Sequence, residues 1–75
     1  MTDFGNKLRE LRAFNNMSQK SAAEALHISA TCYAGYEQGY REPDFKTLIK
    51  ICKLYQVSAD YLLGLETDED AIIKQ

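Results

Sequence analysis

Residues that start helices recur at short intervals along this 75-residue chain and divide it into short segments. Ser and Asp side chains accept hydrogen bonds from the free N–H groups at a helix start, and four of them precede helix-forming runs. The four are Ser18, Ser29, Asp44 and Ser58. Isolated helices shorter than about 12–15 residues are marginal in water, so these segments must bury apolar faces against one another. No stretch of four or more residues alternates with a period of two, and we therefore expect an all-α protein.

The spacing of the apolar residues predicts five helices. In the first, apolar residues recur every three or four positions before the Asn15–Asn16 turn and form one helix face. They are Phe4, Leu8, Leu11 and Phe14. The other helices are expected at residues 19–26, 30–38, 45–55 and 59–63. The apolar stripe of the fourth consists of Phe45, Leu48, Ile51, Cys52 and Tyr55. Gly39 suits the left-handed position that ends the third helix.

The charges are distributed unevenly along the chain. Nine basic and eleven acidic residues give a net charge of −2, and residues 65–75 hold four of the acids but only one lysine. We therefore expect a helical domain over residues 1–64 and a short acidic tail over residues 65–75. Within the tail, Thr67–Asp70 resembles a capping box. The tail is either a frayed acidic end or an association segment that becomes ordered when Ile72 and Ile73 meet a partner.

The chain lacks the residue patterns of several functional classes. Cys32 and Cys52 stand 20 positions apart, which fits neither a disulfide framework nor a zinc site, so we expect reduced thiols and a cytoplasmic protein. With one histidine and no glycine-rich phosphate loop, we expect no enzyme, no metal, no cofactor and no small-molecule substrate. No apolar run approaches the ~20 residues of a membrane span, so no membrane is expected as a partner. A binding module is the favoured class.

The second and third predicted helices are joined by only three residues, His27, Ile28 and Ser29. Helix, short connection and helix is the sequence shape of a helix-turn-helix. Further marks occur in order at Leu8–Arg12, Met17–Gln19, Ala22–Leu26, Ile28–Ser29, Tyr36–Gly39, Pro43–Asp44 and Val57–Gly64. With these marks the chain resembles the lambda-repressor-like (Cro/XRE) helix-turn-helix DNA-binding family over about residues 4–64. The resemblance implies a compact five-helix bundle whose second helix lies over the DNA backbone and whose third enters the major groove.

The resemblance also implies functional residues. The expected DNA-binding set is Ser18, Gln19, Lys20, Ser29, Ala30, Thr31, Cys32, Ala34, Gly35, Gln38, Tyr40 and Arg41. Gln19 lies in the first turn of the second helix, where free backbone N–H groups and its amide would hold a phosphate. Arg12 and Glu37 match a paired arginine and glutamate that join the first helix to the third. His27 stands where the family usually has glycine, so we expect a left-handed backbone there.

The third helix departs from the family pattern. Family base readers occupy its first, second, third and sixth positions, which here are Ala30, Thr31, Cys32 and Gly35. None is Arg, Lys, Asn or Gln, the residue types that make bidentate contacts with base edges. Either the small side chains approach thymine methyl groups closely, or the surface binds DNA weakly and serves a protein partner. In the first case we expect A·T-rich sites.

Two functions therefore remain open. The first is a cytoplasmic transcriptional regulator, a repressor that binds double-stranded DNA as a homodimer on a palindromic operator. The second is a protein-interaction module, such as an antitoxin-like or regulatory partner, that uses the same fold with weak DNA binding. The acidic pI of about 5.2 favours the second, whereas Gln19, Lys20 and Arg41 favour DNA.

Overall fold

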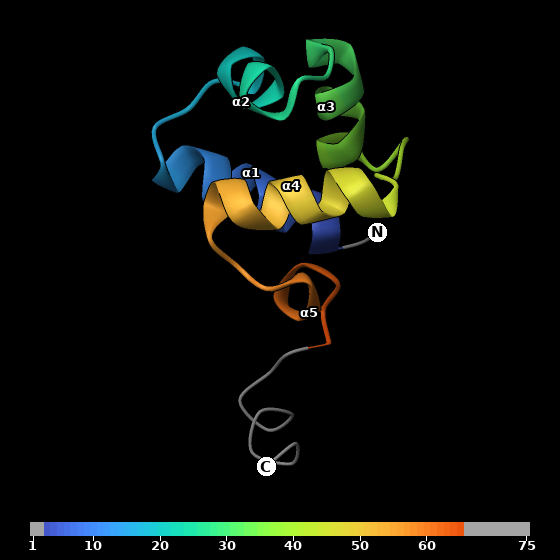
Figure 1. Cartoon of the computed structure of the whole chain (residues 1–75). Helices are drawn as coiled ribbons and strands as arrows, with labels where there is room; N and C mark the ends of the chain where they lie inside the picture. The colour runs from blue at the N-terminus through green and yellow to red at the C-terminus, as the bar shows by residue number, and fades with distance from the viewer. Residues whose placement is uncertain (1–2, 66–75) are drawn as a thin grey trace.

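The computed structural model describes residues 3–65, which form five α-helices and no strand (Figure 1). The helices are α1 (Asp3–Phe14), α2 (Gln19–Leu26), α3 (Ala30–Gln38), α4 (Phe45–Tyr55) and α5 (Ala59–Leu62). The all-α prediction is confirmed, and α5 ends one residue earlier than expected. In the tail, the predicted capping box and the Ile72–Ile73 segment lie outside the described residues.

Local hydrogen bonds explain why the helices begin and end at these residues. Each of the four predicted capping side chains accepts a hydrogen bond from the backbone N–H of the residue three positions later. Ser18 accepts from Ser21, Ser29 from Cys32, Asp44 from Thr47 and Ser58 from Tyr61. Left-handed residues follow α2 and α3, at His27 with φ 61° and at Gly39 with φ 87°. These short signals act within one helical turn and set the residues at which the helices begin and end.

The core lies where the five helices converge. Its largest fully buried side chains are Leu8, Leu26, Tyr33, Ile51 and Leu62, one from each helix. The helix α3 packs against both α1 and α2. In Figure 1, α2 and α3 lie at one end of the molecule and α5 at the other, with α1 and α4 between them. This arrangement leaves one side of α3 to solvent.

Two aromatic residues do not join the core as their spacing predicted. Phe14 and Phe45 are each 85% exposed, although both were expected on apolar helix faces. Phe14 is the last residue of α1 and Phe45 the first residue of α4, so each lies beyond the part of its stripe that neighbouring helices cover. The period of a helix shows which side is apolar but not where the covering elements end.

A glycine sets the closest approach between α1 and α3. A Cβ on Gly5 would run into the backbone carbonyl of Glu37, so only glycine allows the two helices to meet at this spacing. The contact brings the N-terminal turn of α1 against the last turn of α3. It thereby fixes the helix whose exposed side is the candidate functional surface.

Candidate nucleic-acid interface

Arg12 on α1 and Glu37 on α3 form a two-pronged ion pair inside the molecule. Arg12 donates from Nε to Oε2 of Glu37 at 2.7 Å and from Nη2 to Oε1 at 3.2 Å. The side chain of Glu37 is 1% exposed and that of Arg12 is 19% exposed. Burial raises the pKa of Glu37, but hydrogen bonds from Arg12, Gln19 and Tyr33 outweigh it and lower the pKa overall. The carboxylate therefore stays charged and neutralised inside the fold.

Gln19 in the first turn of α2 is tied to the same carboxylate. Its Nε2 donates to Oε1 of Glu37 at 3.0 Å, so one hydrogen of the amide predicted to face a phosphate points inward instead. An amide group has a second N–H, which this bond leaves available. The consequence is a fixed spatial relation between the start of α2 and α3. Sequence reasoning missed this bond, because residues 18 positions apart give no local signal of contact.

The turn between α2 and α3 is built by its own backbone. His27 adopts the left-handed conformation (φ 61°, ψ 41°) expected from the resemblance, and its N–H donates to the carbonyl of Glu24 at 3.1 Å. Ser18 and Ser29, both in the predicted DNA-binding set, are the N-caps of the two helices. The oxygen of each hydroxyl accepts a backbone N–H, and each serine thereby positions its helix.

The outer face of α3 consists of Ala30, Thr31 and Gln38, which are exposed, and Ala34, which is half-buried. Cys32 does not belong to this face. It packs partly against the core, and its Sγ donates to the hydroxyl of Tyr36 at 3.4 Å. Of the four positions expected to read bases, only Ala30 and Thr31 therefore present an exposed side chain.

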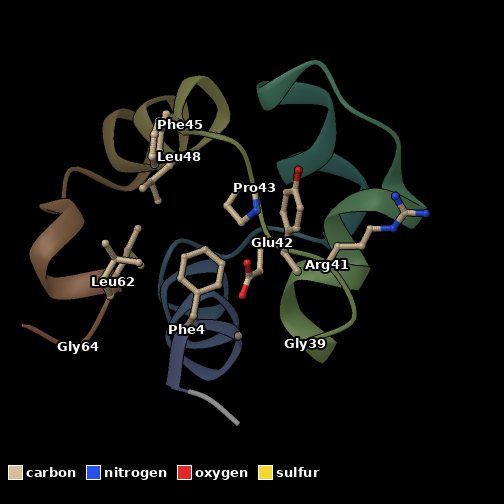
Figure 2. A pocket seen from close by; sticks show the side chains of 12 residues that line it. Phe4, Gly39, Arg41, Glu42, Pro43, Phe45, Leu48, Leu62 and Gly64 are labelled. Carbon is tan, nitrogen blue, oxygen red and sulfur yellow. The ribbon is translucent and has the colours of Figure 1, made fainter.

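Arg41 covers the fourth of those positions, Gly35. A Cβ on Gly35 would lie 2.9 Å from Cδ and 3.0 Å from Cγ of Arg41, so the aliphatic part of the arginine occupies the space that a side chain would fill. The N–H of Arg41 also donates to the carbonyl of Gly35 at 3.2 Å. In Figure 2 the Arg41 side chain runs alongside α3, and its guanidinium points away from the pocket. A glycine inside a predicted helix with an arginine six residues later was the available sequence signal.

A groove of about 590 Å³ lies among the helices beside this surface, and the Arg41 side chain lies at its border (Figure 2). We call it the apolar groove; its lining includes Phe4, Phe45, Leu48, Leu62 and Leu63. Phe45 and Leu63 are largely exposed, at 85% and 54%. Arg41 and Glu42 also line the groove, and its exposed apolar side chains lie beside these two charged residues.

The structure also places the remaining residues to which the sequence drew attention. Cys32 and Cys52 are both free thiols, as predicted. Within residues 3–65, no group of three or more His, Cys, Asp or Glu side chains is placed to hold a metal ion. No helix in this part of the chain is long and apolar enough to cross a membrane. Lys20, Tyr40 and Arg41, from the predicted DNA-binding set, are all exposed.

Two helices joined by three residues, the second with one side open to solvent, define a helix-turn-helix protein. The family model described as helix-turn-helix matches residues 8–62. The chain belongs to this helix-turn-helix family of transcriptional regulators, which is not an enzyme family.

Several curated relatives carry the same type of domain. The chain is 48% identical over 60 residues to the HTH-type transcriptional regulator ImmR of Bacillus subtilis, a match that covers 80% of this chain and 47% of ImmR. It is 31% identical over 72 residues to the cryptic phage CTXphi transcriptional repressor RstR of Vibrio cholerae, covering 95% of this chain and 65% of RstR. It is 33% identical over 64 residues to the uncharacterized HTH-type transcriptional regulator MJ0272 of Methanocaldococcus jannaschii, a match that covers 85% of this chain and 97% of MJ0272. The chain thus spans about half the length of the Bacillus relative.

Proposed function

We propose that this chain binds double-stranded DNA in the cytoplasm and represses transcription as a homodimer on a palindromic operator. The observation that carries the proposal is the carboxylate of Glu37, which Arg12 and Gln19 both bind. These bonds hold the start of α2 and the outer face of α3 in one fixed arrangement. A rigid arrangement of this kind suits a surface that must place one helix on phosphates and the next in a groove.

The electrostatics of this side of the molecule support a phosphate partner. The first turn of α2 has free backbone N–H groups, and Lys20 adds an exposed positive charge there. Arg41 adds a second charge beside α3. Glu37 is the only acidic residue of α3, and its burial against Arg12 keeps that negative charge away from the surface. A net charge of −2 for the whole chain is therefore compatible with DNA binding at this surface.

The residues of the expected set then divide by role. Gln19, Lys20 and Tyr40 would contact the backbone of the duplex, whereas Ser18 and Ser29 would act by positioning α2 and α3. The side chains that would enter the groove are Ala30, Thr31, Ala34 and Gln38. Cys32 would contribute to the packing of α3 on the core.

The proposed dimer is supported by the small area of DNA that one copy of α3 can contact. One helix in the major groove covers a half-site, and a two-fold dimer reads a palindrome. We place the dimer contact at the apolar groove, because Phe45 and Leu63 expose apolar surface there that a second copy would bury. Repression by occupying the operator is the simplest mechanism for a domain of this size, and one relative is named as a repressor.

The test is binding of the full chain to a labelled random-sequence duplex, measured by fluorescence anisotropy over a series of salt concentrations. Phosphate contacts release counterions, so we expect affinity to fall steeply as salt rises. Lys53→Ala is the matched control: Lys53 is exposed in the last turn of α4, and its loss should leave the salt dependence unchanged. No binding to any duplex at low salt would overturn the proposal and favour a protein-interaction module with the same fold.

A further inference from the structure

We infer that Arg41, carried on the loop after α3, reads a guanine in the major groove from the position that Gly35 leaves open. The inference rests on the proposed function and goes beyond it by naming a base-reading residue and the base it selects. It adds a hydrogen-bonding residue to the alternative in which small side chains of α3 approach thymine methyl groups.

The placement of Arg41 supports the inference first. The Cγ, Cδ and Nε atoms of Arg41 lie 2.9–3.3 Å from the Cβ position of Gly35. The arginine is thus laid against α3 as if it were a side chain of that helix. The backbone N–H of Arg41 is fixed to the carbonyl of Gly35 at the same place, which limits how far the loop can carry the side chain away.

The glycine itself is the second argument. Glycine in the interior of a helix lowers helix stability, and at Gly35 the backbone is ordinary helix without a positive φ that would require it. The atoms nearest its Cβ position all belong to Arg41. Room for the arginine is therefore the structural requirement that Gly35 meets.

The side chains around Arg41 on the outer face of α3 also support the inference. Ala30 and Thr31 offer methyl groups and one hydroxyl, so they cannot form two parallel hydrogen bonds to a base. The guanidinium of Arg41 is a planar fork that matches O6 and N7 of guanine. A free loop arginine would also bind phosphate. Because the aliphatic part of Arg41 is held along α3, its guanidinium instead enters the major groove together with that helix.

The experiment is selection of bound sequences from a random duplex pool for the full chain and three variants, together with anisotropy measurements on random duplex. The wild type should select one guanine in each half-site. Arg41→Ala should lose that guanine, with a fall in preference of roughly 5- to 160-fold, which is the range for one bidentate contact. Arg41→Lys still donates to O6 and N7 but lacks the planar fork, so it should keep a reduced guanine preference. Arg41→Lys keeps the charge and should retain most of the affinity for random duplex.

Gly35→Ala separates the proposed reading role from a simple loss of charge. The new methyl group would displace only the flexible Arg41 side chain, so the variant should fold and keep its full charge. We expect it to lose the same guanine preference, with unchanged salt dependence on random duplex. An unaltered selected sequence in Arg41→Ala, with equal weakening on all duplexes, would make Arg41 a phosphate contact and overturn the inference alone. Failure of the wild type to bind any duplex would overturn the proposed function and the inference together.

Discussion

The hydroxyl groups of Tyr33 and Tyr55 meet in the core, with 2.8 Å between their oxygens, and so join α3 to α4. Both side chains are buried. Tyr33→Phe would leave the hydroxyl of Tyr55 without this partner and would also remove the hydrogen bond of Tyr33 to Glu37, and we expect a loss of about 1–3 kcal/mol of stability in urea unfolding. The double variant Tyr33→Phe, Tyr55→Phe removes both hydroxyl groups and should recover part of that loss. If the double variant loses the sum of the single losses, the hydroxyl groups do not act as a pair.

The stability of the fold should depend on acid through Glu37. Its pKa is lowered from the ordinary value of 4.5, so its contribution is present above that value and is lost as pH falls through the lowered one. Urea unfolding at a series of pH values from 6 to 3 should therefore show a steeper loss for the wild type than for Glu37→Gln. At neutral pH we expect Glu37→Gln to be less stable by about 3 kcal/mol, because Arg12 loses its buried partner. Equal acid sensitivity of the two proteins would contradict this role.

Gly5 and Gly35 should respond oppositely to the same substitution. Gly5→Ala puts a methyl group against the backbone carbonyl of Glu37, and we expect it to cost about 1–3 kcal/mol through forced separation of α1 and α3. Gly35→Ala is the matched control, because the atoms nearest its methyl group belong to the Arg41 side chain and the gain in helix propensity is up to ~1 kcal/mol. Thermal melts of both variants provide the measurement. A stabilised Gly5→Ala would show that the contact between the helices is not tight.

Lys20 should contribute to binding without contributing to sequence preference. It is exposed in the first turn of α2. Lys20→Ala should weaken binding to all duplexes about equally and reduce the slope of log affinity against log salt by about one unit. Gln19→Ala should also weaken binding to all duplexes, and in addition it removes one hydrogen bond to Glu37. A changed selected sequence in Lys20→Ala would contradict the assignment of this lysine to the DNA backbone.

Self-association should depend on the apolar groove. Phe45→Lys places a charge at its edge, and sedimentation of the full chain should show a weaker dimer. Phe14→Lys makes the same change at an equally exposed phenylalanine that does not line the groove. At protein concentrations at which the chain is monomeric, neither variant should alter the thermal melt, since both side chains are 85% exposed. Equal dimerisation of the two variants would place the contact elsewhere.

Local rules were enough to predict the helices. Capping side chains act within four residues, and for this reason Ser18, Ser29, Asp44 and Ser58 located the helix starts. Periodicity failed at Phe14 and Phe45, because burial there depends on where other helices end.

The candidate site depended more on contacts between distant residues. The pairing of Arg12 with Glu37, 25 positions apart, came from the family resemblance and not from any local pattern. The bond from Gln19 to Glu37 and the contact of Arg41 with Gly35 needed three-dimensional placement. Small residues on α3 were correctly identified, but a helix examined alone cannot show that a loop residue covers one of them.

The sharing of one carboxylate by two helices has a consequence for motion. Local opening of α2 away from α3 would break the hydrogen bond from Gln19 to Glu37, and opening of α1 would break the ion pair between Arg12 and Glu37. Loss of Arg12 would leave a buried charge unpaired, and loss of Gln19 would remove one hydrogen bond from it, so we expect the turn at His27 to open only together with the rest of the molecule. We therefore expect the helix-turn-helix unit and the core to unfold as a single cooperative unit.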